Sequence, residues 1–226
     1  YNAALKEVSS NNSSGGGSSG GSSGGKHSAS IVPNVESNQE AETINKNIFD
    51  DLDSVPWASE AIINLAVKGV VNGKTESIFA PDDFITRQEF TKLVVAALVT
   101  DVEPTEIAFS DVDEDSWAYP YISKAKAAGI INGYSESLFG AEDMITRQDM
   151  SVIIYNAAKY KEVKTDGVDN ALVFADDADI SDYAKEAVYS LKAIGIVNGT
   201  DSIHFEPQNN ATRAEAAVMI YRLLLK

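Results

Sequence analysis

A five-residue stretch, Ile-Thr-Arg-Gln-Glu at residues 85–89, constrains the fold of this chain more than any other feature because it occurs three times. It returns as Ile-Thr-Arg-Gln-Asp at residues 145–149 and as Ala-Thr-Arg-Ala-Glu at residues 211–215. The copies stand roughly 60 residues apart, and other landmarks move with them, so the chain is predicted to be a repeat protein.

Each copy of this stretch predicts the beginning of a helix. A Thr followed three residues later by an acid, ahead of apolar residues at helical spacing, is the pattern of a capping box, which stabilises a helix by about 1 kcal/mol. The Arg then occupies the first helical position, where the helix dipole disfavours a cation by about 0.3–1 kcal/mol. Its recurrence predicts a negative partner: either an anion bound by free helix N–H groups and the guanidinium, or a carboxylate of the chain itself.

The remaining landmarks predict two helices and an ordered loop in each copy. Apolar residues at helical spacing precede Gly69, a residue typical of a helix C-cap, and a second apolar series follows Thr86. One such unit buries too little core to stand alone, so the three must pack together, round a common axis or as an open stack. The landmarks that recur in order are Phe49, Asp51, Trp57, Gly73 and Phe79; Phe109, Asp111, Trp117, Gly133 and Phe139; and Phe174, Asp176, Tyr183, Gly199 and Phe205.

Composition shifts set the expected boundaries. Residues 1–48 form a flexible linker and the tail of an upstream region, since residues 9–25 are almost all Ser, Gly and Asn. The repeats are expected at 49–108, 109–173 and 174–226. Because the chain begins at Tyr1 without a charged-then-apolar signal segment, we expect it to be a processed piece of something longer.

Charge and residue types exclude several classes of function. A net charge of −16 opposes nucleic acid or an anionic membrane as a partner held by general electrostatics, and no apolar run approaches the ~20 residues needed for membrane insertion. With no cysteine and two isolated histidines, His27 and His204, neither a metal site nor a catalytic triad is expected. The acidic run at residues 111–115 fails as a calcium loop because Ser116 stands where glycine is required. No cofactor is expected.

Taken in order, Phe-x-Asp, Trp-Ala, Gly-Val/Ile-Val/Ile-Asn-Gly, Phe-x-Pro and Thr-Arg-x-Glu resemble the S-layer homology domain family, over residues 49–226 and in three tandem copies. The resemblance implies an all-α fold: three helix-loop-helix repeats in a pseudo-threefold, three-pronged assembly around a central helical bundle. Tyr183 replaces Trp in the third copy and Asp149 replaces Glu in the second. Gly140-Ala141 stands where the first copy has Ala80-Pro81.

The resemblance also implies a function. Members of this family anchor extracellular proteins non-covalently to the bacterial cell wall or S-layer. Their ligand is a secondary cell-wall polysaccharide linked to peptidoglycan, often with a pyruvate ketal on an amino sugar, and its carboxylate fits the anion hypothesis. Grooves between neighbouring repeats would bind the sugar, and the Ser/Gly linker would separate an upstream cargo domain from the wall. The arginines central to binding in this family correspond here to Arg87, Arg147 and Arg213.

Other landmark residues are candidates with two roles each. Trp57, Trp117 and Tyr183 could stack on a sugar or fill the core between repeats. Three aspartates could accept sugar hydroxyls or cap the first helix of each copy, namely Asp51, Asp111 and Asp176. The glycines of the Asn-Gly pairs fit turns and would let a ligand approach the backbone, namely Gly73, Gly133 and Gly199.

Two other functions remain compatible with the pattern. A surface-layer repeat could serve self-assembly by binding protein rather than glycan. A wall-glycan-acting enzyme is less consistent, because acidic residues abundant enough for a glycosidase pair form no pattern beyond the repeat. Enzymes concentrate their chemistry in one site, whereas this chain repeats its best candidate three times, so no enzymatic activity is expected.

Overall fold

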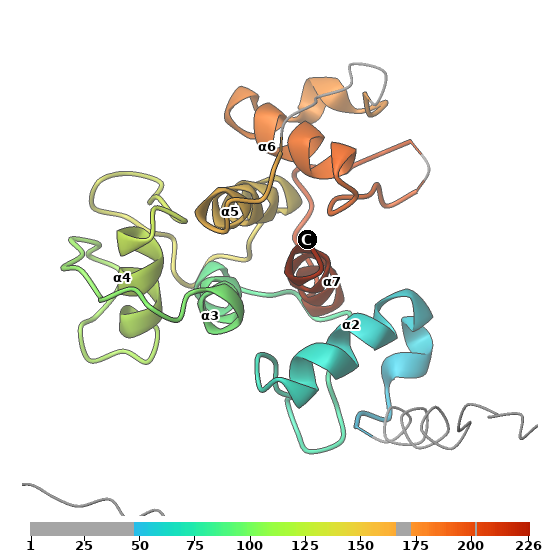
Figure 1. Cartoon of the computed structure of the whole chain (residues 1–226), viewed down its shortest axis with the longest axis horizontal. Helices are drawn as coiled ribbons and strands as arrows, with labels where there is room; N and C mark the ends of the chain where they lie inside the picture. Colours follow the sequence, from blue (N-terminus) through green and yellow to red (C-terminus); the bar gives the residue numbers. More distant parts are fainter. Residues whose placement is uncertain (1–47, 166–172, 202) are drawn as a thin grey trace, which may run out of the picture. The chain divides into compact units, whose positions relative to one another are not determined.

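The computed structural model describes residues 48–165, 173–201 and 203–226, and this part of the chain is all-α (Figure 1). It contains six α-helices, two short 3-10 helices and three isolated β-bridges, and no strand is formed in these ranges. The all-α prediction is therefore confirmed. The predicted linker and His27 lie outside the described residues, apart from Ile48.

Each repeat contributes one outer and one inner helix (Figure 1). The outer helices follow short turns rich in Asp, and two of them, in the first and second repeats, have proline within their first two positions. The inner helices all begin at the Arg of the repeated stretch. In chain order the elements are η1 Leu52–Ser54, α2 Pro56–Val67, α3 Arg87–Leu98, α4 Tyr119–Ala127, α5 Arg147–Tyr160, η3 Asp177–Asp179, α6 Asp182–Ala193 and α7 Arg213–Leu224.

The predicted caps form at all three inner helices, but one is incomplete. In α3 and α7 the Thr hydroxyl accepts the N3 amide and the N3 glutamate accepts the Thr amide, so both halves of the box are present. In α5 the hydroxyl of Thr146 accepts the amide of Asp149, and no return bond forms. The aspartate side chain is one methylene shorter than glutamate, and it accepts a hydrogen bond from Tyr183 instead. The prediction of a full box was wrong for this copy.

The inner helices α3, α5 and α7 contact one another in every pairing, and each outer helix packs mainly on the inner helix of the preceding repeat. Thus α4 packs on α3, α6 packs on α5, and α2 of the first repeat packs on α7 of the third. This last contact joins the ends of the series, so the alternative of an open stack is excluded. Fully buried apolar side chains on the inner helices, such as Phe90, Met150 and Ile220, fill the core.

A circuit of backbone hydrogen bonds joins the three segments that lead into the inner helices. The amide of Ile145 donates to the carbonyl of Ile85 at 3.0 Å, that of Ala211 to Ile145 at 2.8 Å, and that of Ile85 to Ala211 at 3.2 Å. All three residues are buried. Because the circuit closes, every repeated stretch is held against the other two, and the residues just after it face loops of neighbouring repeats.

Candidate functional site

Two grooves are each built from all three repeats. Groove A contains the loop at residues 72–74 of the first repeat, Arg213 of the third and Trp117 of the second, and has a volume of about 280 Å³. Groove B contains the loop at residues 198–200 of the third repeat, Arg147 of the second and Trp57 of the first, with about 400 Å³. Both are close to the size of small-ligand sites. Each of these two grooves therefore brings together one predicted arginine, one predicted tryptophan and one loop glycine.

The aspartate landmarks hold the loops that form the groove walls. The carboxylate of Asp51 accepts the amides of Phe79 and Ala80 at 3.0 and 2.7 Å, and Asp176 likewise accepts those of Phe205 and Glu206. Although Asp51 and Asp176 precede the 3-10 helices, neither side chain caps them. The prediction of helix caps was therefore wrong, because the amides of the distant loop compete successfully for the carboxylates.

In the second repeat Asp111 accepts three amides, those of Phe139, Gly140 and Ala141, at 2.7–2.9 Å. Burial by itself would raise the pKa of this carboxyl, but the three backbone hydrogen bonds outweigh it and hold the pKa below its ordinary value. The pKa of Asp176 is lowered for the same reasons. These carboxylates are committed to the loops, so the idea that they accept sugar hydroxyls finds no support in their contacts.

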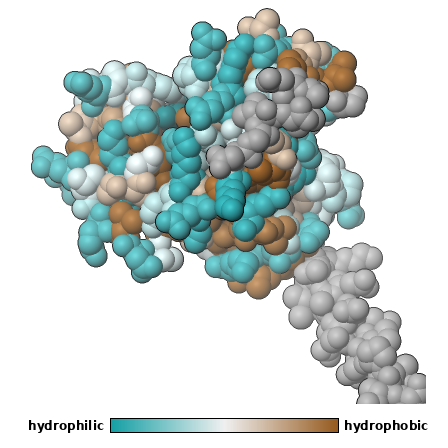
Figure 2. Space-filling model, turned by 45° about the horizontal axis from the view of Figure 1, so that its top comes forward, coloured by the Kyte–Doolittle hydropathy of each residue, from teal (hydrophilic) through white to brown (hydrophobic). Residues whose placement is uncertain are grey.

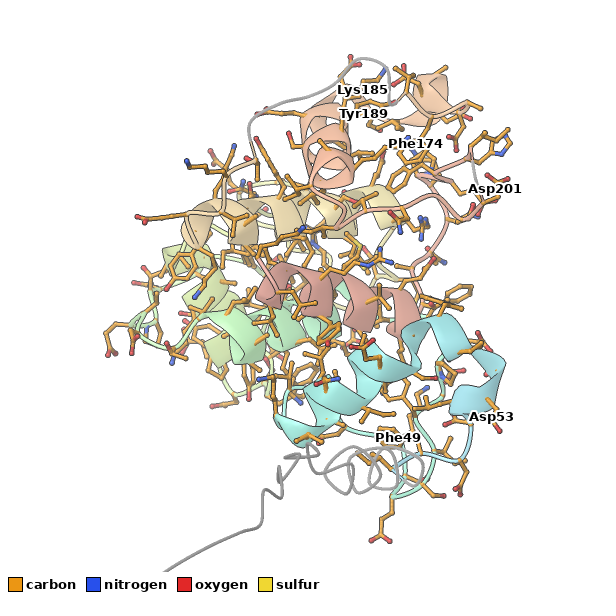
Figure 3. All side chains as sticks on the ribbon, turned by 45° about the vertical axis from the view of Figure 1, so that its right-hand side comes forward. Phe49, Asp53, Phe174, Lys185, Tyr189 and Asp201 are labelled. Carbon is orange, nitrogen blue, oxygen red and sulfur yellow. The ribbon has the colours of Figure 1, made fainter. Side chains whose placement is uncertain are left out.

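Close packing explains the loop glycines. A β-carbon at Gly73 would collide with the carbonyl oxygens of Thr75 and Ile78 and with the ring of Phe49. Gly133 and Gly199 are equally enclosed by the carbonyls of their own loops. Beneath each loop two landmark phenylalanines pair, with ring centroids 5.4–5.5 Å apart. In the third repeat Tyr189 lies beside Phe174 as well (Figure 3). The loops are thus packed closely against side chains and carbonyls of their own repeat.

The arginines bind backbone carbonyls of the next loop. In groove B, Nε of Arg147 donates to Phe205 O at 2.8 Å and Nη2 to Asn198 O at 3.3 Å, and the guanidinium pairs with Glu215. In groove A, Arg213 makes the matching bonds to Phe79 O and Asn72 O at 3.0 and 2.8 Å. Each guanidinium also lies over the ring of a landmark phenylalanine. These arginines join repeats, and for Arg147 the predicted negative partner is a carboxylate of the chain itself, that of Glu215.

Arg213 keeps one edge of its guanidinium without a carboxylate. Among the described residues it forms no ion pair, whereas Arg147 has Glu215 and Arg87 has Asp149 at 4.0 Å. Burial lowers the pKa of Arg213, while nearby carboxylates, Glu89 first, oppose that shift. An arginine remains charged under such shifts. Groove A therefore holds an arginine with hydrogen-bonding capacity to spare.

The expected free N–H groups at the helix starts are absent from these grooves. The amides of Arg147 and Gln148 donate to Asn209 O and Pro207 O at 2.9 and 3.0 Å, and the N3 amide is held by Thr146. The corresponding amides of α3 and α7 are bonded in the same way. The prediction of an anion held by helix amides was wrong, because loops of the neighbouring repeat already satisfy them. An anion in a groove would have to bind the arginine side chain.

The aromatic landmarks lie on the surface. Trp57, Trp117 and Tyr183 are 57%, 50% and 61% exposed, so the alternative that they fill the core is excluded. Figure 2 shows one face of the molecule, on which apolar patches lie among hydrophilic residues. Lys92 of groove A lies with its ammonium 5.7 Å from the centroid of the Trp117 ring. A flat aromatic at the edge of a groove offers apolar area to the face of a sugar ring.

Sequence reasoning missed several groove residues. Lys74, Lys92 and Glu89 line groove A, and Glu215, Met219 and Arg222 line groove B. Capping explains Glu89 and Glu215 in the sequence pattern, although their recurrence was a signal that could also have indicated a role in the grooves. The lysines and Met219 do not recur between repeats, so nothing in the pattern pointed to them.

Within the described ranges, no helix is long and apolar enough to cross a membrane, and no group of three or more His, Asp or Glu side chains is placed to hold a metal ion. The grooves instead offer a guanidinium, a rigid backbone loop and an exposed indole. This set can bind an anionic group and a flat apolar face together. It contains no paired nucleophile and base.

Comparison with known proteins identifies similar sequences. The model of the S-layer homology domain matches residues 48–91, 108–151 and 173–217. The chain is 38% identical over 174 residues to the amylopullulanase of Thermoanaerobacterium thermosulfurigenes and to exoglucanase XynX of Acetivibrio thermocellus. It is 27% identical over 171 residues to the surface-layer 125 kDa protein of Lysinibacillus sphaericus. These matches cover 74–75% of this chain but only 9–16% of the relatives.

Proposed function

Because this chain belongs to the S-layer homology domain family, we propose that it anchors an extracellular protein to the bacterial cell wall. The ligand is a secondary cell-wall polysaccharide, bound non-covalently in the grooves between repeats. Relatives named as glycan-degrading enzymes and as surface-layer proteins match this chain over a small part of their length. We infer that this chain likewise serves a larger polypeptide as an attachment module, with a cargo domain elsewhere in it.

The observation that carries this proposal is the convergence, in each groove, of an arginine, a glycine-containing loop and an exposed tryptophan from three different repeats. A guanidinium binds a carboxylate through two parallel hydrogen bonds, and an indole packs on the apolar face of a sugar. A sugar bearing a carboxylate, such as a pyruvate ketal of an amino sugar, satisfies both. A neutral peptide could offer the guanidinium a carbonyl oxygen, but neither the charge nor the paired oxygens of a carboxylate.

Overall charge restricts how such a ligand binds. With a net charge of −16, the chain repels an acidic polymer at long range. Attraction is therefore local. In groove A it comes from Arg213 and Lys92, because Lys74 is already paired with Asp83, and the carboxylate of Glu89 opposes it. At the ionic strength of a cell surface, charges more than about 8 Å away are screened. Local pairing thus dominates once the ligand enters the groove.

Sedimentation with cell-wall sacculi tests this proposal. The full 226-residue chain is mixed with sacculi that retain their secondary polysaccharide and with sacculi stripped of it by hydrofluoric acid. We expect pelleting with the former alone. Replacing Trp57 and Trp117 by Ala should weaken pelleting about tenfold for each indole lost, about 1.4 kcal/mol per site.

Both indoles are exposed, so these changes leave the core intact, and Val67→Ala, at another exposed apolar residue of α2, serves as the matched control. Equal pelleting with stripped sacculi would exclude the polysaccharide as ligand. A chain that binds neither kind of sacculus but associates with itself would favour the self-assembly function.

A further inference from the structure

The same three contributions meet a third time, but here the space is filled. Groove C is defined by the loop at residues 132–134 of the second repeat, Arg87 of the first and Tyr183 of the third. The residue after the Asn-Gly pair is Lys74 in groove A and Thr200 in groove B, but Tyr134 in groove C. The guanidinium carbon of Arg87 lies 4.7 Å from the centroid of the Tyr134 ring and 5.0 Å from that of Phe139.

Tyr134 therefore covers a part of the arginine that grooves A and B leave without an aromatic partner. Arg213 and Arg147 each lie over a single phenylalanine ring, Phe79 and Phe205. The Nε groups of both donate to a carbonyl of the next loop, whereas Nε of Arg87 is buried without an acceptor among the described residues. Arg87 thus lies over two aromatic rings, donates to Asn132 O at 2.9 Å and has the carboxylate of Asp149 at 4.0 Å.

A glycine makes room for the tyrosine ring. A β-carbon at Gly140 would collide with the edge of the Tyr134 ring, coming within 2.8 Å of Cδ2 and closer to Cε2. Gly140 has φ +81°, and the equivalent residues Ala80 and Glu206 have φ +58° and +57°. Since those two residues adopt nearly the same backbone, this conformation alone does not require glycine in this fold. The missing side chain is what lets the ring lie there.

The aromatic at the mouth of groove C is tied to its wall. The hydroxyl of Tyr183 donates to Asp149 Oδ1 at 2.7 Å and accepts from Gln148 Nε2 at 2.9 Å. Asp149 is the counterpart of Glu89 and Glu215, which line grooves A and B. The bond from Tyr183 to Asp149 therefore links the third repeat to the second across the place where a ligand would enter.

We propose that Tyr134, seated on Gly140 and Arg87, closes groove C, so that the chain carries two working glycan grooves instead of three. This proposal rests on the proposed function, since it concerns which grooves accept the same ligand. Tyr134 takes the place of a ligand ring over the arginine, and Tyr183 bonds the groove wall instead of a sugar. All three arginines are present, yet one serves only to join repeats.

Counting sites on the full chain tests the proposal. The probe is a radiolabelled methyl glycoside of a pyruvylated N-acetylhexosamine, and equilibrium dialysis to saturation gives the number bound per chain. We expect two for the wild type. Tyr134→Thr, which installs the groove B residue, and Gly140→Ala, which displaces the ring without removing it, should each raise the number to three. The double variant Thr200→Tyr/Glu206→Gly transfers to groove B both the tyrosine and the glycine that makes room for its ring. It should lower the number of bound probe molecules to one.

Three sites on the wild type, or two on both opening variants, would overturn the closure of groove C. A wild type that binds no probe would overturn the proposed function instead. Closure is also measured without ligand, because NMR should show nuclear Overhauser contacts between the Tyr134 ring protons and the α-protons of Gly140. Their absence would contradict the closed groove whether or not the glycan binds.

Discussion

At the residue scale, the aspartate landmarks show how one side chain positions a loop. Asp111 is separated from the amides that it accepts by 28–30 residues of sequence. Its carboxylate accepts the loop amides that a neighbouring strand would accept in a β-sheet. Its position was predictable, since it recurs as Asp51 and Asp176. Its partners were not, because backbone amides have no residue identity and leave no signal in the sequence.

Replacing Asp111 by Asn should lower the free energy of unfolding at neutral pH by about 1–3 kcal/mol, because an amide cannot accept all three bonds. Since the pKa of Asp111 is lowered in the folded chain, its contribution is complete above the unfolded value of about 4 and is lost as pH falls through the folded value. The difference between wild type and variant should therefore shrink below about pH 4. Urea titrations at several pH values measure it.

The matched control is Asp113→Asn, since the carboxylate of Asp113 makes no hydrogen bond among the described residues and this change should have little effect at any pH. A difference between wild type and Asp111→Asn that stays constant from pH 7 to pH 3 would contradict the role of the ionised carboxylate.

At the element scale, periodicity and capping residues predicted the helices well. The inner helices begin at Arg87, Arg147 and Arg213, each with the preceding Thr as cap, as Thr-Arg-x-acid indicated. Periodicity does not reveal which helices face each other, and α2 packs on α7 instead of on α3 from its own repeat. That pairing depends on the closed series of contacts, which no single repeat encodes.

The arginine at each helix start joins two elements, and its loss should destabilise the fold. Arg147→Ala should lower the free energy of unfolding by about 2–4 kcal/mol, because it removes the donor to Oε1 of Glu215 and to the carbonyls of Phe205 and Asn198. Lys92→Ala also removes a groove cation. Among the described residues Lys92 makes no hydrogen bond or ion pair and only approaches the Trp117 ring, so its loss should change stability by about 0.5 kcal/mol or less.

Urea unfolding of the two variants measures whether Arg147 stabilises the fold or serves only to bind a ligand. Wild-type stability in Arg147→Ala would show that its bonds to the neighbouring loop contribute nothing, and would assign the residue to binding alone.

At the scale of the whole molecule, the repeats form a closed series, and each carries part of its neighbours' sites. Groove A needs all three repeats, as does groove B. The resemblance to the S-layer homology family implied grooves between repeats and their arginines, and landmark residues could be named in advance. The filling of groove C could not be predicted, because the sequence places Tyr134 in a loop but does not show that its ring lies against Arg87.

A closed series predicts cooperative unfolding across repeats. Ile220 is fully buried in α7 of the third repeat, and Ile220→Ala should cost about 2–4 kcal/mol. The two tryptophans, Trp57 and Trp117, report from the first and second repeats. The midpoint of the urea transition seen by their fluorescence should fall by the same amount as the midpoint seen by far-UV circular dichroism, because no repeat remains folded without the third. A tryptophan transition left at its wild-type midpoint would contradict this.

The central claim is that the grooves recognise a carboxylate on a wall sugar. Calorimetric titration of the full chain with purified secondary wall polysaccharide, before and after mild acid removal of pyruvate, tests it most directly. Arginine-centred recognition predicts clear binding to the intact polymer and at least a tenfold loss after removal of the ketal, about 1.4 kcal/mol or more. Equal affinity for both polymers would contradict that claim and transfer recognition to the sugar hydroxyls and the exposed aromatics.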